Sequence, residues 1–156
     1  MITALNASDV IVHRERLVEL FSYCKLKSSG ELPGRCFSEE KIDSLISYLS
    51  DGRAYLFAEC DGGELYGFLW ACRVVRENEE RMHILYFAVS EDRAGRGIGS
   101  ELLLAVEREA ILAGLSRCEL NVHIHNESAR RFYEKRGYKR EGDIFSERVI
   151  FVKQLP

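Results

Sequence analysis

The segment SEDRAGRGIGSELL, residues 90 to 103, carries the clearest structural signal in the chain. It places three glycines within five positions, at 95, 97 and 99, accompanies them with Arg93 and Arg96, and continues into an apolar run. Glycine tolerates positive φ and lets an anion approach the main chain closely. At the start of a helix, free main-chain N–H groups and the positive end of the helix dipole point to one place. The stretch therefore predicts an anion-binding loop between a strand that ends at Val89 and a helix.

Three other interpretations of this glycine loop are weaker. A P-loop needs a lysine directly after its last glycine, and none is present here. A dinucleotide fingerprint needs a glycine at position 102, which is Leu102, and it opens a βαβ unit, whereas antiparallel strands are expected before this loop. A glycine-rich turn that only connects a strand to a helix remains an alternative for the loop taken alone.

Size, charge and cysteine usage narrow the class of protein. The 156 residues are 46% hydrophobic and 30% charged, which predicts a single globular domain over residues 1–156. A net charge of −3 argues against nucleic acid as a partner. No apolar run is long enough to cross a membrane and no signal segment is recognisable, so we expect no membrane partner and a cytoplasmic location. The five cysteines are scattered without a CxxC pair, so we expect neither disulfides nor a metal.

The spacing of apolar residues predicts the order of elements. The expected strands are 2–5, 53–60, 64–75, 81–89, 117–124 and 144–153. The expected helices are one capped by Ser8, one from Ser38 to Gly52, one from the glycine loop to Gly114, and one from Asn126 to Gly137; a loop is expected at 25–37. The three central strands form an antiparallel meander, and the strand, helix, strand order after it implies a parallel crossover. The predicted fold class is α+β, a mixed sheet with helices on both faces.

A second motif, NESARRFYEKRGYKREG at residues 126–142, follows the glycine loop at a distance. Together with FAVSEDRAGRGIGSELL at 87–103 it resembles the GNAT superfamily of N-acyltransferases, whose signature joins an [RQ]xxGx[GA] loop to a later NxxAxxxYxxxGF motif. Asn126, Ala129, Tyr133, Gly137 and Tyr138 occupy the family positions, with Tyr138 in place of the usual Phe. The resemblance covers about residues 82–142.

One position of the loop departs from the family pattern. Ala94 stands where the family has Arg or Gln, so one side-chain contact to the pyrophosphate of the cofactor is missing. Arg93 and Arg96 are the neighbouring candidates to replace it. Main-chain N–H groups, which carry most of this recognition, do not depend on that side chain.

The resemblance implies a GNAT-like, mostly antiparallel sheet, acetyl-CoA as the cofactor and acetyl transfer to a primary amine of a small molecule or peptide. It also suggests a homodimer by analogy. Family substrates include aminoglycosides, polyamines, amino acids and protein N-termini, and no motif here selects among them. By their place in the two motifs and the preceding strand, the residues expected to contact the cofactor are Phe87, Ala88, Val89, Ala94, Gly95, Arg96, Gly97, Ile98, Gly99, Ser100, Asn126, Ala129 and Phe132.

The resemblance assigns the general acid, and position suggests a general base. Tyr133 lies at the family's acid position, where a phenol stays protonated at neutral pH and can donate to the leaving thiolate; its alternative role is that of a core aromatic. His83, six residues before Val89, is the candidate base, with a structural histidine as the alternative. Glu79 and Glu80 are weaker candidates for the base.

Further interpretations stay open at this point. His123 and His125 share the spacing of a metal pair but have no accompanying ligand, so residues of the substrate cleft are favoured. Arg130 is a candidate contact for the phosphate of the cofactor's adenosine. A CoA-binding module without transferase activity, and a purely structural domain, are the alternatives to an enzyme.

Overall fold

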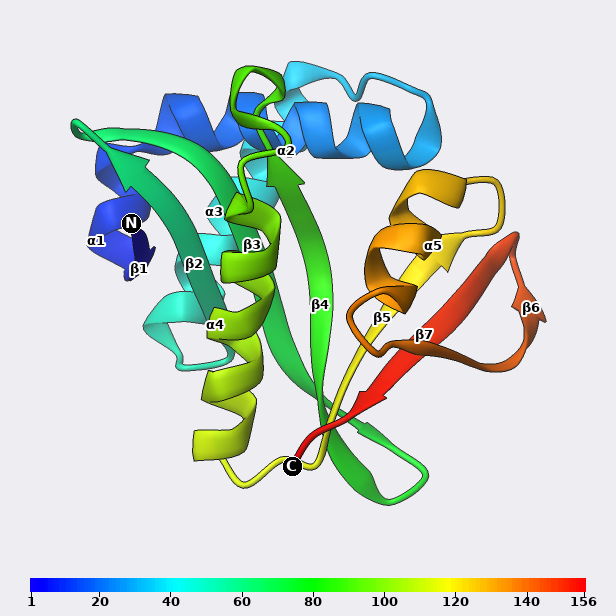
Figure 1. Cartoon of the computed structure of the whole chain (residues 1–156). Helices are drawn as coiled ribbons and strands as arrows, with labels where there is room; N and C mark the ends of the chain where they lie inside the picture. The colour runs from blue at the N-terminus through cyan, green and yellow to red at the C-terminus, as the bar shows by residue number, and fades with distance from the viewer.

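The computed structural model describes all 156 residues and forms one seven-stranded sheet with helices on both faces (Figure 1). The strands are β1 (Ile2–Ala4), β2 (Ala54–Asp61), β3 (Glu64–Arg76), β4 (Glu79–Val89), β5 (Arg117–His123), β6 (Lys139–Phe145) and β7 (Arg148–Gln154). The helices are α1 (Ala7–Val12), α2 (Arg14–Ser29), α3 (Arg35–Ser50), α4 (Ile98–Leu112) and α5 (Glu127–Glu134). No helix is both long and apolar enough to span a bilayer.

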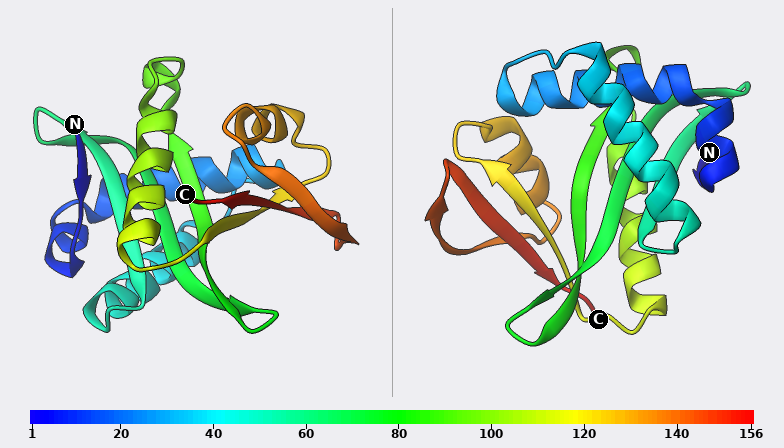
Figure 2. Two further views of the ribbon diagram at one scale, coloured as in Figure 1. Left: turned by 60° about the horizontal axis from the view of Figure 1, so that its bottom comes forward. Right: turned by 180° about the vertical axis from the view of Figure 1, so that it is seen from behind.

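The strand order is β1-β2-β3-β4-β5-β7-β6. Strands β2, β3 and β4 pair antiparallel, as expected for a meander, and β4 pairs with β5 in parallel through the α4 crossover. Two separate cores cover the two faces of the sheet. One lies under α4 and α5, the other under α1, α2 and α3. The two views in Figure 2 show these two groups of helices on opposite faces of the sheet. The predicted α+β class with helices on both faces is therefore confirmed.

The start of the first helix was predicted wrongly. Asn6, not Ser8, is the N-cap: its side chain accepts a hydrogen bond from the Asp9 N–H at 3.0 Å, and the Asp9 carboxylate accepts one from the Asn6 N–H at 2.8 Å. This reciprocal pair satisfies two main-chain donors, whereas Ser8 has no such partner three residues on. The helix is also interrupted at His13, which divides it into α1 and α2.

The loop expected at 25–37 is mostly helical. Helix α2 continues to Ser29 and ends at Gly30, whose φ of 78° closes it in the left-handed conformation, and α3 already begins at Arg35. Ser38 was therefore wrong as a cap. Its side chain is buried between the helices, where its Oγ lies 2.7 Å from the Oγ of Ser22. The hydrogen-bond partner of the Ser38 hydroxyl lies on another helix, α2. The spacing of residues around Ser38 cannot predict such a partner.

The final strand is in fact a hairpin of β6 and β7. The predicted strand at 144–153 crosses its turn, where Ser146 and Glu147 both have positive φ, 47° and 60°. Every residue of β6 is exposed, so the apolar alternation that reveals a half-buried strand is absent. The Ser-Glu pair also lacks the glycine or asparagine that usually marks such turns.

One irregularity in β4 decides where the site forms. In the pairing with β3, Trp70 faces Tyr86 and Ala71 faces Ile84, so Leu85 is an extra residue, a β-bulge. Before the bulge Met82 and Ile84 face the α4 core. After it, Phe87 and Val89 face that core while Tyr86 and Ala88 face the α2 side. The bulge thus reverses which residues point to each face.

The parallel pairing of β4 with β5 ends at the same place. Only Met82 to Ile84 pair with Cys118 to Leu120, and beyond Ile84 the two strands separate, as Figure 1 shows. From Leu85 to Val89 the edge of β4 that faces β5 therefore has no strand partner. A gap of this kind leaves main-chain polar groups free for a ligand.

Candidate active site

The separation of β4 and β5 opens into a cavity of about 950 Å³. Residues from both faces of the sheet line the cavity, because successive side chains of a strand point to opposite faces. On the α4 side lie Phe87 and Val89, together with Tyr133 of α5. On the α2 side lie His83 and Tyr86. The cavity therefore passes through the sheet and connects its two faces at the point where the strands part.

The glycine loop forms one end of this cavity. Gly95 and Gly97 have φ of 77° and 83°, which side-chain-bearing residues rarely adopt, and a Cβ at either position would meet no atom within 4 Å. None of the main-chain N–H groups from Gly95 to Ser100 donates a hydrogen bond within the chain. A helix start normally leaves about four such donors. Six consecutive free donors at the start of α4 suit a diphosphate group.

Gly99 is required for a different reason. A Cβ there would lie 3.3 Å from the ring of Phe132, so the first turn of α4 packs directly against α5. The ring of Phe132 in turn packs against Phe87 of β4, with ring centroids 5.7 Å apart. The three elements that line the cavity on this face are fixed to one another by these contacts.

The cation beside the loop is Arg136, which the sequence did not single out. Its guanidinium lies over the ring of Phe132, 3.6 Å from the centroid, and its Nε donates to Ser100 Oγ at 3.0 Å. Arg93 lines the cavity but is held by Asp61 at 3.1 Å and lies over Tyr66. Arg136 is thus the arginine in contact with the first turn of α4, where Ala94 supplies no charge.

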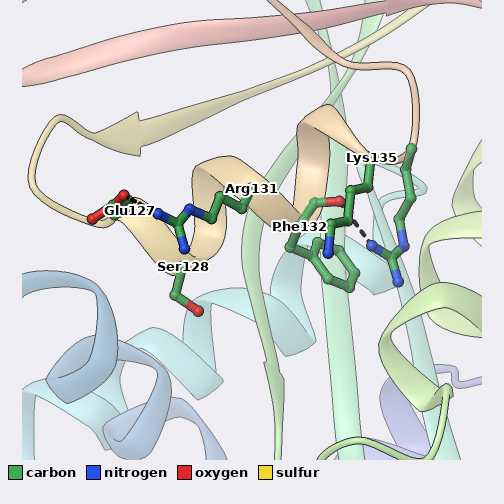
Figure 3. Close-up of a pocket in the computed structure, with 6 residues that line it drawn as sticks. Glu127, Ser128, Arg131, Phe132 and Lys135 are labelled. Carbon is green, nitrogen blue, oxygen red and sulfur yellow. Dashed lines mark hydrogen bonds and ion pairs between the residues drawn. The ribbon is translucent and has the colours of Figure 1, made fainter.

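A shallow pocket of about 570 Å³ continues from this point along α5 (Figure 3). Arg131, Lys135 and Arg136 line it, and Arg131 is turned toward Glu127 at the start of the helix. Arg130, the sequence candidate for this role, lines neither pocket. The cations next to the loop therefore come from one face of α5, and helical spacing alone did not indicate which face points to the loop.

Tyr133 lies at the centre of the aromatic wall. Its side chain is 8% exposed, and its ring packs edge-on against Phe132 and Tyr138, with centroids 5.2 Å and 5.6 Å away. Burial raises the pKa of Tyr133 above its ordinary value, so the phenol is protonated at neutral pH. Tyr133 is a core residue, as its alternative role predicts, and it also lines the cavity.

His83 lines the other side of the cavity and belongs to a buried polar network. Its Nδ1 lies 2.7 Å from Oε2 of Glu119, its partner on β5, and Glu119 also accepts two hydrogen bonds of 2.7 Å from Arg76. Burial opposes ionisation of Glu119, but the hydrogen bonds from His83 and Arg76 outweigh it and lower its pKa to about 2. The network fixes the imidazole ring through Nδ1 and leaves Nε2 for the cavity.

Most residues expected at the site meet there. The lining includes Tyr133, His83 and the expected cofactor residues other than Arg96, which is exposed and does not line the cavity. Asn126 also caps α5, accepting from the Ala129 N–H at 3.2 Å. Glu79 and Glu80 do not line the cavity. His123 does, but its Nε2 lies 3.3 Å from Glu147, and no group of three or more potential metal ligands is present.

Free main-chain donors that lead into an apolar slot between two separating strands suit a long ligand with a phosphate end and an uncharged arm. The buried phenol of Tyr133 lines the same cavity. These are the features of an acyltransferase that uses a coenzyme A thioester. Residues 15–138 match the sequence profile of the Acetyltransferase (GNAT) family, and the chain belongs to this family. Acetyl-CoA is the acetyl donor of the family.

Known proteins agree with this assignment. The chain is 26% identical over 86 residues to an uncharacterized N-acetyltransferase, YycN, of Bacillus subtilis, a match that spans 55% of this chain and 55% of YycN. The fold is similar to that of a PaiA N-acetyltransferase from Thermoplasma acidophilum in complex with coenzyme A, with a TM-score of 0.73, 20% identity and 99% of both chains covered. It is also similar to an aminoglycoside 6'-acetyltransferase type Ii, with a TM-score of 0.79, 20% identity and coverage of 100% of this chain and 98% of that one.

Proposed function

We propose that this protein transfers an acetyl group from acetyl-CoA to a primary amine by direct attack, with Tyr133 as the general acid and His83 as the general base. The single observation that carries the proposal is the row of six free main-chain donors at Gly95–Ser100, which opens into the gap between β4 and β5 where Tyr133 lies. An anion site alone would fit many ligands. The combination with a slot that ends at a proton donor favours a thioester.

The residues present fit coenzyme A. The donors from Gly95 to Ser100 would hold the pyrophosphate, Arg136 would add charge beside it, and the unpaired edge of β4 up to Val89 would accompany the uncharged arm. Arg131 and Lys135 offer cations for a further phosphate on the outer side of α5. This assignment uses the expected cofactor residues and replaces the missing charge at Ala94 by Arg136.

The chemistry needs a neutral amine, a site for the developing oxyanion and a proton for the leaving thiolate. Bound acetyl-CoA supplies the acetyl group as a reactive thioester. His83 accepts the proton that the ammonium group must lose, and a free main-chain N–H near Ala88 or Val89 stabilises the oxyanion. The new bond joins the amine nitrogen to the acetyl carbon while the carbon–sulfur bond breaks. Tyr133 gives its proton to the sulfur, and the nitrogen loses its second proton to solvent as the amide forms. Exchange with solvent then returns His83 to its neutral form and Tyr133 to its protonated form.

The positions of His83 and Tyr133 on opposite faces of the sheet support this division of roles. His83 faces the α2 side and Tyr133 the α4 side. An amine that enters from the α2 side would meet the base first, and the sulfur on the other side would meet the acid. The two proton transfers would then not compete for one group.

The test is binding of acetyl-CoA by calorimetry, together with release of free thiol in the presence of primary amines. Gly97→Glu should abolish binding, because the new carboxylate would stand in the open space in front of the free donors. Gly52→Glu is the matched control, since Gly52 also has positive φ, +70°, and open space around it but lies at the end of α3. Tight binding by Gly97→Glu would refute the phosphate site. Binding of acetyl-CoA without any amine-dependent thiol release would instead identify a non-catalytic CoA-binding module.

A further inference from the structure

The charged side chains that line the cavity are basic, which does not suit a polycationic ligand. Of its 31 lining residues none is an aspartate or glutamate. The basic residues in the lining are Lys25, Lys27, Arg93, Arg136 and Arg148, in addition to His83 and His123. The acidic residues Glu31, Glu39, Glu40 and Glu64 all lie outside it.

Three of these cations have neither a carboxylate partner nor a side-chain hydrogen bond. Arg93 is bound to Asp61, and Arg136 is engaged with Ser100, whereas Lys25, Lys27 and Arg148 form no ion pair. Carboxylates on β5 and in the β6–β7 turn already have partners. Glu119 is bound to Arg76 and His83, and Glu147 lies beside His123.

The three unpaired cations lie on the side from which the amine would enter. Val149 and Phe151 of β7 face the α4 core, so Arg148 points to the opposite face. Arg148 lines the cavity together with Tyr86, which packs against the α2 core. Lys25 and Lys27 come from the last turns of α2, on the same face. Arg93 and Arg136, the cations beside the glycine loop, do not belong to this group.

The helix dipole accounts only in part for this arrangement. Lysines are favoured near the C-terminus of any helix, which applies to Lys25 and Lys27. It does not apply to Arg148 at the start of a strand. Nor does it explain a lining without a single carboxylate in a chain whose Asp and Glu residues, 25 in all, outnumber its 22 Lys and Arg residues.

We propose that the acceptor amine of this enzyme carries an anionic group, a carboxylate or a phosphate, which Arg148 and Lys25 bind while the amino group faces His83. This inference rests on the proposed transferase function and specifies its substrate class. A polycationic acceptor, such as a polyamine or an aminoglycoside, would meet like charges and no carboxylate to pair with. An anionic group would instead gain charge-assisted hydrogen bonds from a guanidinium that has no competing partner.

Amines that share one aminopropyl skeleton and differ only in the terminal group test the inference. The set is 4-aminobutanoate, 3-aminopropylphosphonate, butylamine and 1,3-diaminopropane, with thiol release from acetyl-CoA as the assay. We expect the two anionic amines to have the highest kcat/KM and the diamine the lowest. Calorimetric binding of 3-aminopropylphosphonate to the protein saturated with CoA gives a second readout that needs no turnover.

A charge-reversal variant of Arg148 tests whether this residue binds the anionic group of the acceptor. Arg148→Glu should raise KM for the anionic amines at least about tenfold, a loss of about 1.4 kcal/mol, and leave KM for acetyl-CoA unchanged. Arg108→Glu is the matched control, because Arg108 is an exposed arginine of α4 outside the cavity. Melting temperatures of both variants confirm that they fold.

The outcomes separate this inference from the proposed function. Preference for the diamine, or an Arg148→Glu variant that changes only KM for acetyl-CoA, would overturn the anionic acceptor and leave the transferase in place. Weaker binding of the phosphonate amine than of the diamine would also overturn it. Thiol release with none of the four amines, although acetyl-CoA binds, would count against the transferase itself.

Discussion

Replacing Tyr133 by phenylalanine removes one hydroxyl and keeps the ring. The ring contacts to Phe87, Phe132 and Tyr138, at centroid distances of 6.3, 5.2 and 5.6 Å, should persist. We therefore expect the free energy of unfolding to change by less than about 1 kcal/mol. The free donors of the glycine loop are also untouched, so KM for acetyl-CoA should stay the same.

The expected effect falls on kcat alone. A positioned proton donor contributes about 10²- to 10⁴-fold to the rate, which corresponds to about 2.7 to 5.4 kcal/mol of barrier. Because burial raises the pKa of Tyr133, the acid is protonated across the neutral range. The ratio of wild-type to variant kcat should therefore be constant from about pH 6 to pH 9, where an ordinary phenol also stays protonated.

Tyr138→Phe is the matched control and should show the opposite pattern. The Tyr138 hydroxyl donates to Oε1 of Glu107 at 3.0 Å, and Glu107 is otherwise held by Lys153 at 2.9 Å. Removing one donor from this buried carboxylate should cost about 1 to 3 kcal/mol of stability and change kcat less than about twofold. The assays are steady-state thiol release with saturating amine and urea unfolding. A Tyr133→Phe variant that retains more than about a third of the wild-type kcat would refute the assignment of the acid.

Three further predictions concern groups around the cavity. The pKa of Glu119 is about 2 against 4.5 for an unperturbed glutamate, so its contribution to stability is complete above about pH 4.5 and is lost as the pH falls toward 2. We expect this loss to be on the order of 2 kcal/mol after solvent screening of the partly exposed Arg76, and to be absent in Glu119→Gln, as acid unfolding curves would show. His83→Gln should lower kcat/KM about 10²-fold at neutral pH and recover as the pH rises, because more of the amine is then already neutral; a pH-independent loss would indicate a structural role. Arg136→Ala should raise KM for acetyl-CoA about tenfold with kcat unchanged, and an unchanged KM would show that Arg136 only joins α5 to α4.

The central strands, the crossover helix and the glycine loop could be predicted because their signals are local. The free donors at Gly95–Ser100 follow from glycine φ angles and from the start of a helix, and the apolar spacing of α4 follows from its buried face. Tyr133 and Asn126 were expected at the site from the resemblance to the family motif, and both line the cavity. Where partners from distant segments override local spacing, the prediction was wrong, as at Ser38, which bonds to Ser22.

Local sequence was enough to predict a strand, a glycine loop and a helix start with free main-chain donors, because each requirement lies within about a dozen neighbouring residues. What surrounds these donors depends on the packing of the whole chain. The bulge at Leu85 and the end of the β4–β5 pairing depend on register between strands, and His83 meets Glu119 from 36 residues away. Arg136 reaches Ser100 across the same separation, and Arg148 faces the α2 side only through the β6–β7 hairpin. Pairing register and helix packing are set by the whole sheet, so no single segment of the chain specifies them.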